Sequence, residues 1–234
     1  MRRRGWAALA LLVVLGLGAG WWTRPAPSGA AAPSGATPSS ASAGTALAAL
    51  ATLPVTGRAP MTGYDRAAFG PAWKDVDRNG CDTRNDVLGR DLLGTEPKAG
   101  THGCVVLRGE LDDPYTGERV DFVRGSGTSA KVQVDHVVAL GDAWQKGAQQ
   151  WSPARREAFA NDPLELLATS GAVNQAKGDG DAATWLPPRK AFRCAYVARQ
   201  VAVKAAYRLT VTAAERDAIA RVLQSCPGQP LPSG

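Results

Sequence analysis

Hydrophobic and polar positions alternate, or hydrophobic positions follow one another, in several short stretches that predict β-strands. Residues 103–111 and 119–123 alternate on either side of the sequence Asp-Pro-Tyr-Thr-Gly at residues 113–117, which favours a tight turn, so together they predict a β-hairpin. Residues 131–140 are β-branched and apolar around an Asp-His pair, and residues 164–168 form another short apolar run. Both runs predict strands that are largely buried.

Apolar residues spaced three and four apart predict helices between and after these strands. The predicted helices cover residues 84–93, 142–150, 153–160, 192–208 and 212–225. Ser152 before Pro153 is a typical helix start, in which a capping side chain precedes a residue that suits the first helical position. Asn174 and Lys177 are expected at the start of a further short helix or helical turn, where their spacing puts both side chains on one face. Strands and helices in this mixed order predict an α+β fold.

Residues 1–59 have the composition of a targeting segment followed by a linker. Residues 1–22 carry three arginines and then an apolar run, which is long for a signal peptide and short for a membrane span, so they predict a signal peptide or a signal anchor. Residues 23–59 are rich in Ala, Pro, Ser and Gly and predict a disordered linker, in which residues 47–53 could form a short helical turn. The folded domain is expected over residues 60–228, either secreted or held on the extracellular face of the cell membrane.

The net charge of +6 does not by itself indicate a surface that binds nucleic acid. Residues 1–24 hold four arginines and no acidic residue, so they account for all but +2 of that charge. A nucleic-acid-binding domain therefore requires a local cluster of basic side chains. The candidates for such a cluster are Lys146, Arg155, Arg156, Lys177, Arg189, Lys190 and Arg193. Arg155, Arg156, Arg189 and Lys190 are predicted to bind substrate, although a solvated protein face also explains any one of them.

All four cysteines follow the targeting segment, which predicts disulfides rather than free thiols in an exported domain. Cys194 and Cys226 lie equally far from the turn that joins the last two predicted helices, so an antiparallel pair of helices brings them level. Cys81 then pairs with Cys104 by elimination. The alternative is a zinc site built from all four thiolates, and the absence of any Cys-x-x-Cys spacing argues against it.

Five blocks of residues, in a fixed order, carry the chemistry that the sequence suggests. They are residues 113–117, Asp135-His136-Val137-Val138-Ala139-Leu140, Asn161-Asp162-Pro163-Leu164-Glu165-Leu166-Leu167-Ala168, Asn174-x-x-Lys177-Gly178-Asp179 and Trp185-Leu186-Pro187-Pro188. In this order they resemble the HNH endonucleases, and more narrowly the C-terminal-domain type of the GmrSD restriction endonucleases, in the form found in secreted actinobacterial proteins. The resemblance runs from about Tyr64 to Cys226, and the ordered series carries it rather than the Asp-His pair alone.

The resemblance implies a ββα-metal core, to which the other helices and the hairpin are added, and it assigns a role to each matching residue. His136 matches the general base that takes a proton from water, and Asp135 matches the first ligand of a divalent metal. Asn174 falls where the family has a second metal ligand, and Lys177 could contact the scissile phosphate. Glu165 stands where many HNH proteins have Asn, so it either orients the catalytic residues or has only a structural role at the strand edge. Asp and Asn oxygens are hard ligands that suit Mg²⁺ or Mn²⁺.

These roles predict a metal-dependent endonuclease that hydrolyses phosphodiester bonds of nucleic acid as a monomer, with DNA favoured over RNA and little sequence specificity. A membrane is a partner only if residues 1–22 are not cleaved. Two alternatives stay open from the residues alone. Asp135 and Glu165 could form the carboxylate pair of a glycosidase, or the domain could be a disulfide-stapled binding module in which His136 is structural. Hydrolases that bind zinc through several histidines are disfavoured, because His102 and His136 are the only two.

Overall fold

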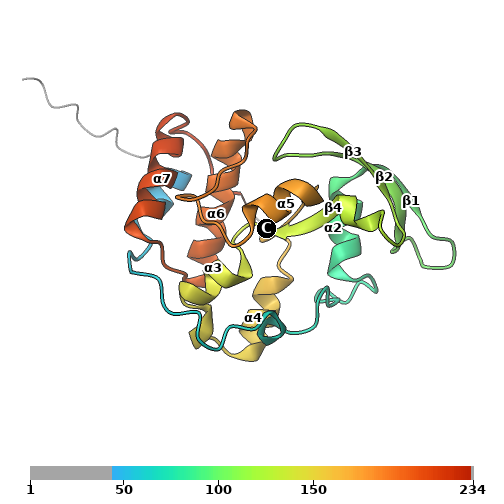
Figure 1. Cartoon of the computed structure of the whole chain (residues 1–234), viewed down its shortest axis with the longest axis horizontal. Helices are drawn as coiled ribbons and strands as arrows, with labels where there is room; N and C mark the ends of the chain where they lie inside the picture. Colours follow the sequence, from blue (N-terminus) through green and yellow to red (C-terminus); the bar gives the residue numbers. More distant parts are fainter. Residues whose placement is uncertain (1–43, 233–234) are drawn as a thin grey trace, which may run out of the picture. The chain divides into compact units, whose positions relative to one another are not determined.

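The computed structural model describes residues 44–232, and Figure 1 shows them as one folded unit. The signal segment predicted over residues 1–22 and most of the predicted linker lie outside the described residues. No helix within residues 44–232 is long and apolar enough to cross a membrane. The fold of the described part is α+β, as the sequence predicts, with two antiparallel sheets and seven α-helices.

The predicted hairpin forms two strands of a three-stranded sheet in the order β1-β2-β3 (Figure 1). The strands are β1 (Leu93–Pro97), β2 (Val106–Asp112) and β3 (Arg119–Val123). The turn between β2 and β3 is closed by the N–H of Gly117, which donates to the carbonyl oxygen of Asp113 over 2.7 Å. β2 starts at Val106 rather than at residue 103, because the preceding residues form a turn in which Gly103 has a φ of 82°.

A separate two-stranded sheet carries the Asp-His pair. Its antiparallel strands are β4 (Val132–His136) and β5 (Leu166–Ser170). β4 is shorter than the predicted strand, because the chain leaves the sheet after His136 and begins a helix at Leu140. β5 begins two residues later than predicted, since the N–H of Glu165 donates to the Asp162 carbonyl (2.9 Å) in the turn before the strand.

Seven α-helices complete the described part of the fold. They are α1 (Ala46–Leu50), α2 (Thr83–Asp91), α3 (Leu140–Gln145), α4 (Pro153–Ala160), α5 (Gly171–Lys177), α6 (Arg193–Tyr207) and α7 (Ala213–Gln224). Ser152 caps α4 as predicted, since its hydroxyl oxygen accepts from the N–H of Arg155. α3 ends at Gln145 rather than at residue 150, because Gly147, with a φ of 131°, separates it from a short 3₁₀ turn.

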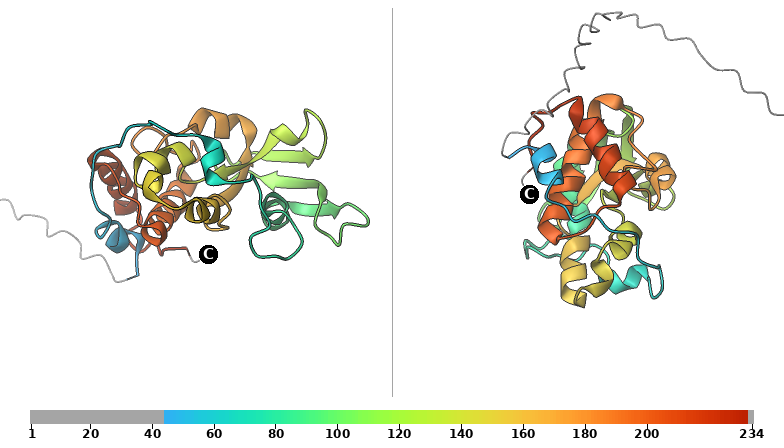
Figure 2. Two further views of the ribbon diagram at one scale, coloured as in Figure 1. Left: turned by 90° about the horizontal axis from the view of Figure 1, so that it is seen from below. Right: turned by 90° about the vertical axis from the view of Figure 1, so that its left-hand side faces the viewer.

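Three clusters of buried apolar side chains meet at the end of β4. The first lies between α1, α6 and α7 and includes Val137. The second joins α3, α4 and α6 and includes Val138, and the third fills the space between α2 and the two sheets and includes Val134. Figure 2 shows α6 and α7 side by side in both views. The residues on either side of the Asp-His pair are therefore fixed by all three clusters, which makes this end of β4 a rigid position.

A buried network of charges links α3, α6 and α7. The ammonium of Lys146 lies 2.8 Å from Asp181 Oδ2 and 2.7 Å from Glu215 Oε2. Lys204 Nζ lies 3.0 Å from Glu215 Oε1 and 3.1 Å from Asp142 Oδ2. Burial alone lowers the pKa of Lys204, but the two carboxylates raise it on balance. Lys146, a candidate for the basic cluster, is thus enclosed in the protein and cannot contact nucleic acid.

Residues 45–59, which the sequence assigns to the linker, belong to the folded unit. The buried side chains of this segment include Ala46, Leu50 and Leu53. α1 contacts both α6 and α7, and beyond it Arg58 Nη2 lies 2.6 Å from Asp181 Oδ2. The disordered linker predicted over residues 23–59 therefore does not hold for this part. The Ala and Leu residues of α1 form one apolar face. Because the whole predicted linker is rich in Ala, its composition does not distinguish this face.

Both predicted disulfides are present. Cys194–Cys226 joins the start of α6 to the chain just after α7, as the antiparallel arrangement of these helices requires. Cys81–Cys104 joins the segment before α2 to the loop between β1 and β2. Because no cysteine in the described part of the chain is free, the alternative of a four-thiolate zinc site is excluded.

Candidate active site

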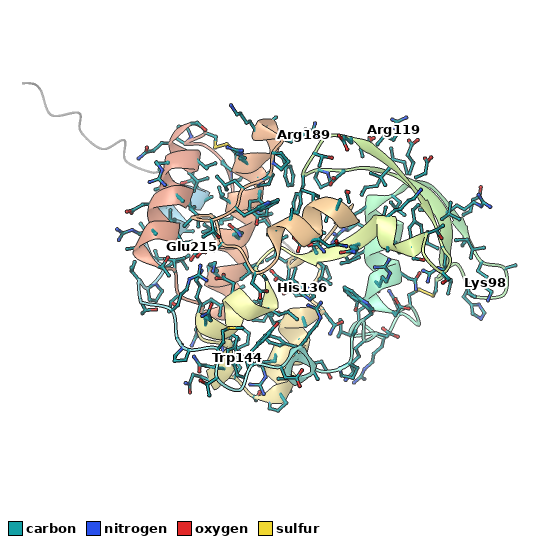
Figure 3. The ribbon with its side chains drawn as sticks, in the orientation of Figure 1. Lys98, Arg119, His136, Trp144, Arg189 and Glu215 are labelled. Atoms are coloured by element: carbon teal, nitrogen blue, oxygen red, sulfur yellow. A yellow bond between two sulfur atoms is a disulfide. The ribbon has the colours of Figure 1, made fainter. Side chains whose placement is uncertain are left out.

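His136 lies at the end of β4, where the strand leads toward α3 (Figure 3). Its side chain is 7% exposed, and its Nε2 lies 3.0 Å from the carbonyl oxygen of Ala160 at the end of α4. Because a carbonyl oxygen only accepts hydrogen bonds, Nε2 carries the proton and Nδ1 keeps a free lone pair. The backbone of α4 thus fixes the tautomer of His136, which the sequence alone does not assign.

The surroundings of His136 keep its ring neutral. Burial, followed by the positive charge of Arg66, lowers the pKa of His136 from 6.5 to about 3. The indole of Trp73 is stacked on the imidazole, with ring centroids 6.0 Å apart and planes inclined by 19°. A neutral imidazole with a free Nδ1 is the form that can accept a proton from a reactant.

Asp135 is buried beside His136 and is held by donors from two other segments. The Tyr115 hydroxyl donates to Oδ2 over 2.6 Å, and Lys177 Nζ donates to Oδ1 over 2.9 Å. Burial raises the pKa of Asp135, and the positive charge of Lys177 offsets part of this effect. Lys177 is only 3% exposed and also donates to the His136 carbonyl over 2.8 Å. Lys177 therefore fixes the Asp-His pair from within the protein.

A polar cavity of about 190 Å³ brings together the predicted base and the predicted metal ligands. Its polar lining consists of Arg66, Gln133, Asp135, His136, Asn174, Gln175 and Asp179. Asn174 lies inside α5 rather than at its start, and its amide donates to Gln133 Oε1 over 2.9 Å. α5 can approach the chain before β4 because it begins with Gly171, where a Cβ would lie 2.1 Å from the carbonyl oxygen of Ala130.

The donors in this polar cavity fit a hydrated divalent ion. Asp135 and Asn174 offer hard oxygen atoms, and each Asp135 oxygen keeps a lone pair beside the hydrogen bond that it accepts. Mg²⁺ is usually bound through one or two carboxylates together with water and substrate phosphate. Within residues 44–232, no three His, Cys, Asp or Glu side chains are grouped closely enough to hold an ion by themselves. Because the Lys177 ammonium opposes another positive charge, we expect weak binding until a phosphate joins the site.

Glu165 lies behind the polar cavity and is not among the residues that line it. Its side chain is 0% exposed, and its two oxygens accept from the N–H of Val138 at 3.1 and 3.2 Å. Burial raises the pKa of Glu165 well above its usual value, and the Val138 N–H offsets part of this. Glu165 thus holds the backbone that follows His136 in place through the Val138 N–H. It does not face Asp135 across an open site, as a glycosidase pair requires.

The four basic residues predicted to bind substrate do not line the polar cavity. Arg155 and Arg156 donate instead to backbone carbonyls of other segments, over 2.7 and 2.8 Å. Arg189, labelled in Figure 3, packs against Gly117 in the hairpin turn. Lys190 follows it at an exposed position. The structure therefore does not assemble these four side chains around His136.

Arg66 is the arginine that does line the polar cavity, and sequence reasoning missed it. It begins a short 3₁₀ turn, Arg66–Phe69, and its side chain is exposed. Within the described part of the chain it forms no salt bridge, which leaves its guanidinium available for an anion. A single turn of this kind shows neither helical nor strand periodicity, and no motif marks it, so no pattern in the sequence points to Arg66.

The comparison with protein families identifies the domain. The family model described as the C-terminal domain of GmrSD restriction endonucleases matches residues 82–222. The chain belongs to this family. A protein of Arthroderma benhamiae, described as an uncharacterized secreted protein, is 37% identical over 175 residues, which cover 74% of this chain and 80% of that protein. No solved structure matches the chain.

Membership of the GmrSD C-terminal-domain family confirms the resemblance and indicates a nuclease-related function with a nucleic acid as substrate. The two disulfides and the secreted relative agree with the predicted export of the domain. His136, Asp135 and Asn174 all lie within the matched residues 82–222. Arg66 and Trp73 lie before them, so a segment outside the matched domain contributes to the site.

Proposed function

We propose that this GmrSD-type domain is an endonuclease that hydrolyses phosphodiester bonds with His136 as general base and a divalent metal ion as cofactor. The observation that carries the proposal is the hydrogen bond from His136 Nε2 to the Ala160 carbonyl, which leaves Nδ1 as a proton acceptor. The polar cavity beside this ring supports it, because its lining suits a phosphate and a hydrated ion. The alternative is a disulfide-stapled binding module, in which the same bond only satisfies a buried side chain.

In the proposed reaction, a water molecule lies between His136 Nδ1 and the phosphorus atom. Nδ1 takes a proton from the water while the water oxygen bonds to phosphorus, and the bond from phosphorus to the leaving sugar oxygen breaks. The leaving sugar oxygen takes a proton from solvent water and departs as an alcohol, and the imidazolium gives its proton to solvent. The Arg66 guanidinium lines the same cavity, so it can balance the negative charge that develops on the phosphate.

Substrate binding should make His136 a stronger base. In the free protein, burial and Arg66 hold its pKa at about 3, so the ring is neutral but weakly basic. A phosphate beside Arg66 offsets that positive charge and brings a negative charge close to the imidazole, which favours the protonated form. The pKa of His136 therefore rises when the phosphate is in position to react.

Asp135 and Asn174 would hold the divalent ion, Mg²⁺ or Mn²⁺, through their oxygen atoms. When bound, such an ion neutralises charge on the phosphate and on the leaving oxygen. Tyr115 and Lys177 hold the Asp135 carboxylate in one orientation through hydrogen bonds of 2.6 and 2.9 Å. Lys177 is thus a positioning residue in this proposal, because its ammonium reaches Asp135 rather than the open cavity.

The proposed substrate is DNA, cut with little sequence preference outside the cytoplasm. Family membership supports a nucleic acid, and the secreted relative supports the location. Phosphate contacts would supply most of the affinity, so binding should weaken steeply as salt concentration rises.

A plasmid-nicking assay tests the proposal. The oxidised protein is incubated with supercoiled DNA and Mg²⁺, Mn²⁺ or EDTA, beside the variants His136→Gln and His102→Gln. The amide introduced by His136→Gln can still donate to the Ala160 carbonyl but takes no proton. His102 is the matched control, because it is exposed in the loop between β1 and β2.

We expect metal-dependent nicking by the unmodified protein and by His102→Gln, and none by His136→Gln. Nicking that persists in His136→Gln would mean that another residue acts as base. A folded protein that cleaves neither DNA nor RNA with any metal would favour the binding module.

A further inference from the structure

A second cavity, of about 240 Å³, adjoins the polar cavity at His136. The two cavities share Arg66, His136 and Leu140. The other walls of the second cavity are mostly apolar and include Phe69, Pro71, Ala72, Trp73 and Ala160. The hydrolysis proposed above does not use this space, which we call the apolar cavity.

We propose that the apolar cavity receives one unpaired nucleobase of the substrate strand, next to the phosphate that is cleaved at His136. This inference rests on the endonuclease function proposed above. The cavity is smaller than the lower limit of about 300 Å³ for sites of drug-sized ligands, so it suits a single flat ring system. Its continuity with the polar cavity, through Arg66 and His136, puts the base site directly beside the phosphate site.

Trp73 supplies an aromatic surface for such a base. It lines the apolar cavity and is half-buried. Nucleobases of every kind stack on aromatic side chains of this type. The backbone of Trp73 has a φ of 60°, a left-handed conformation that bulky residues rarely adopt. Strained positions of this kind cluster at binding sites, because only the surrounding structure holds them.

Asn161 lines the apolar cavity and contains a hydrogen-bond acceptor without a donor. Its side chain is 1% exposed, and its amide nitrogen donates to the Glu157 carbonyl over 2.9 Å. Because that carbonyl only accepts, the remaining atom must be the amide oxygen, and Oδ1 is buried without a hydrogen-bond partner within residues 44–232. A buried acceptor without a donor is rare in proteins. Oδ1 is also closed off from solvent, so the Asn161 side chain has to shift before an exocyclic amino group of a base in the cavity can donate to it.

Part of the wall of the apolar cavity comes from residues that precede the matched residues 82–222. Arg66 and Trp73 precede residues 82–222, which the family model matches. Arg66 lines both cavities, so its guanidinium can hold the phosphate that connects the bound base to the reacting centre. The segment before residue 82 therefore contributes to both the phosphate site and the apolar cavity.

The proposal has a consequence for the substrate. A base that is paired and stacked in a duplex cannot enter the apolar cavity, whereas a base in a single strand or at a mismatch can leave its stack at little cost. We therefore expect single-stranded or locally unpaired DNA to be the preferred substrate, with amino-bearing bases favoured over thymine at the position that enters the cavity.

A binding experiment tests the subsite without relying on cleavage. Deoxyadenosine 5′-monophosphate and deoxyribose 5-phosphate are titrated separately into the ¹⁵N-labelled oxidised protein without metal, and the Trp73 indole and Asn161 amide signals are followed. We expect only the nucleotide to shift both signals. Trp73→Leu should weaken nucleotide binding about 5- to 140-fold, the loss typical of one stacked base, whereas Trp73→Phe, which keeps an aromatic face, should bind nearly normally.

A cleavage experiment tests the same subsite within a strand. Three substrates of one sequence are compared: a single strand, the same strand with one abasic position, and the duplex. We expect the single strand to be cut fastest, and the bond next to the abasic position to be cut more slowly than the same bond in the intact strand.

The two experiments separate this inference from the proposed function. Nucleotide binding that depends on Trp73, without cleavage of any substrate, would refute the endonuclease and support the base site. Cleavage that is equal on all three substrates, together with equal binding of nucleotide and sugar phosphate, would refute the base site and leave the endonuclease standing.

Discussion

The Tyr115 hydroxyl donates a hydrogen bond of 2.6 Å to Asp135 Oδ2, which joins the β2–β3 turn to the strand that carries His136. The same turn is bound to the neighbouring strand, because the Thr169 hydroxyl donates to Asp113 Oδ1 over 2.7 Å. Both contacts are buried. The hairpin turn therefore holds Asp135 in place from behind the cavity and is not only a connection between two strands.

Replacing Tyr115 with Phe should impair both stability and cleavage. Loss of a hydrogen bond to a buried carboxylate costs about 1–3 kcal/mol of unfolding free energy, and Asp135 is then free to turn away from the cavity. Urea denaturation and the nicking rate measure the two effects. Tyr196→Phe is a matched control, because Tyr196 is equally buried but its hydroxyl contacts Gln200 rather than Asp135. If both variants keep full activity, the Tyr115 contact has no role in orienting Asp135.

Replacing Lys177 with Met should destabilise the protein by about 3–5 kcal/mol at neutral pH, because the Asp135 carboxylate stays buried without its ammonium partner. In the unmodified protein, Lys177 lowers the pKa of Asp135. Without Lys177, that pKa lies further above its value in the unfolded chain. A carboxyl whose folded pKa is raised stabilises the fold at low pH and loses this contribution as pH rises. The deficit of Lys177→Met should therefore shrink as pH falls.

The double variant Lys177→Met with Asp135→Asn tests whether the two side chains stabilise the fold as a pair. Without a charge on either side chain, the buried site lacks the unpaired carboxylate, so the double variant should be more stable at neutral pH than Lys177→Met alone. Unfolding free energies are measured at several pH values for the unmodified protein, the two single variants and the double variant. Together they give the interaction energy between the two side chains. Purely additive losses would show that the two side chains do not act as a pair.

His136 should make the fold sensitive to acid. Its pKa is about 3 in the folded protein, with burial as the main cause, against 6.5 in the unfolded chain. The unfolded chain therefore binds one more proton between these values, and stability falls as pH drops from about 6.5 toward 3, by about 1.4 kcal/mol for each pH unit. Asp135 and Glu165 have raised pKa values and act in the opposite direction.

Comparison with His136→Gln removes the contribution of these carboxyls, because both proteins contain them. The unfolding free energy of the unmodified protein should fall relative to that of His136→Gln as pH drops from about 6.5 toward 3. His102→Gln should follow the unmodified protein. A difference that stays constant from neutral to acid pH would mean that the His136 ring takes up its proton at the same pH in the folded protein as in the unfolded chain.

Elements with a local signal were predicted well. The Ser152-Pro153 start of α4 and the hairpin around residues 113–117 depend on neighbours in the sequence, and the Cys194–Cys226 pair follows from two helices of similar length. The errors lie at element ends. The apolar run after His136 predicts a longer strand, but those residues are buried by packing against helices, because an apolar run signals burial rather than sheet pairing.

Some residues of the candidate site could be predicted from the sequence, and others could not. Asp135, His136 and Asn174 could be predicted together, because motif order fixes them on one sheet and the helix that follows it. Arg66 and Trp73 could not, since tertiary contacts alone position their segment. One such contact is the Arg156 guanidinium, which donates to the Ala68 carbonyl over 2.8 Å. The sequence suggested that Arg156 binds substrate, whereas in the structure it anchors the segment that carries Arg66.

The N-terminal boundary of the folded domain gives the last prediction. Compared with a chain that starts at residue 44, one that starts at residue 59 should lose about 3–6 kcal/mol of unfolding free energy. The loss arises because Leu50 and Leu53 are buried, and each buried leucine contributes about 1.5–3 kcal/mol. Denaturation of the oxidised proteins measures the difference.

The single variant Leu50→Ala checks that packing of α1 is the cause, and it should account for about 2–5 kcal/mol by itself. Thr52→Ala is the control, since Thr52 is exposed in the same segment. Equal stability of the chains that start at residues 44 and 59 would restore the predicted linker up to residue 59. It would also show that the contacts of α1 with α6 and α7 contribute nothing to the fold.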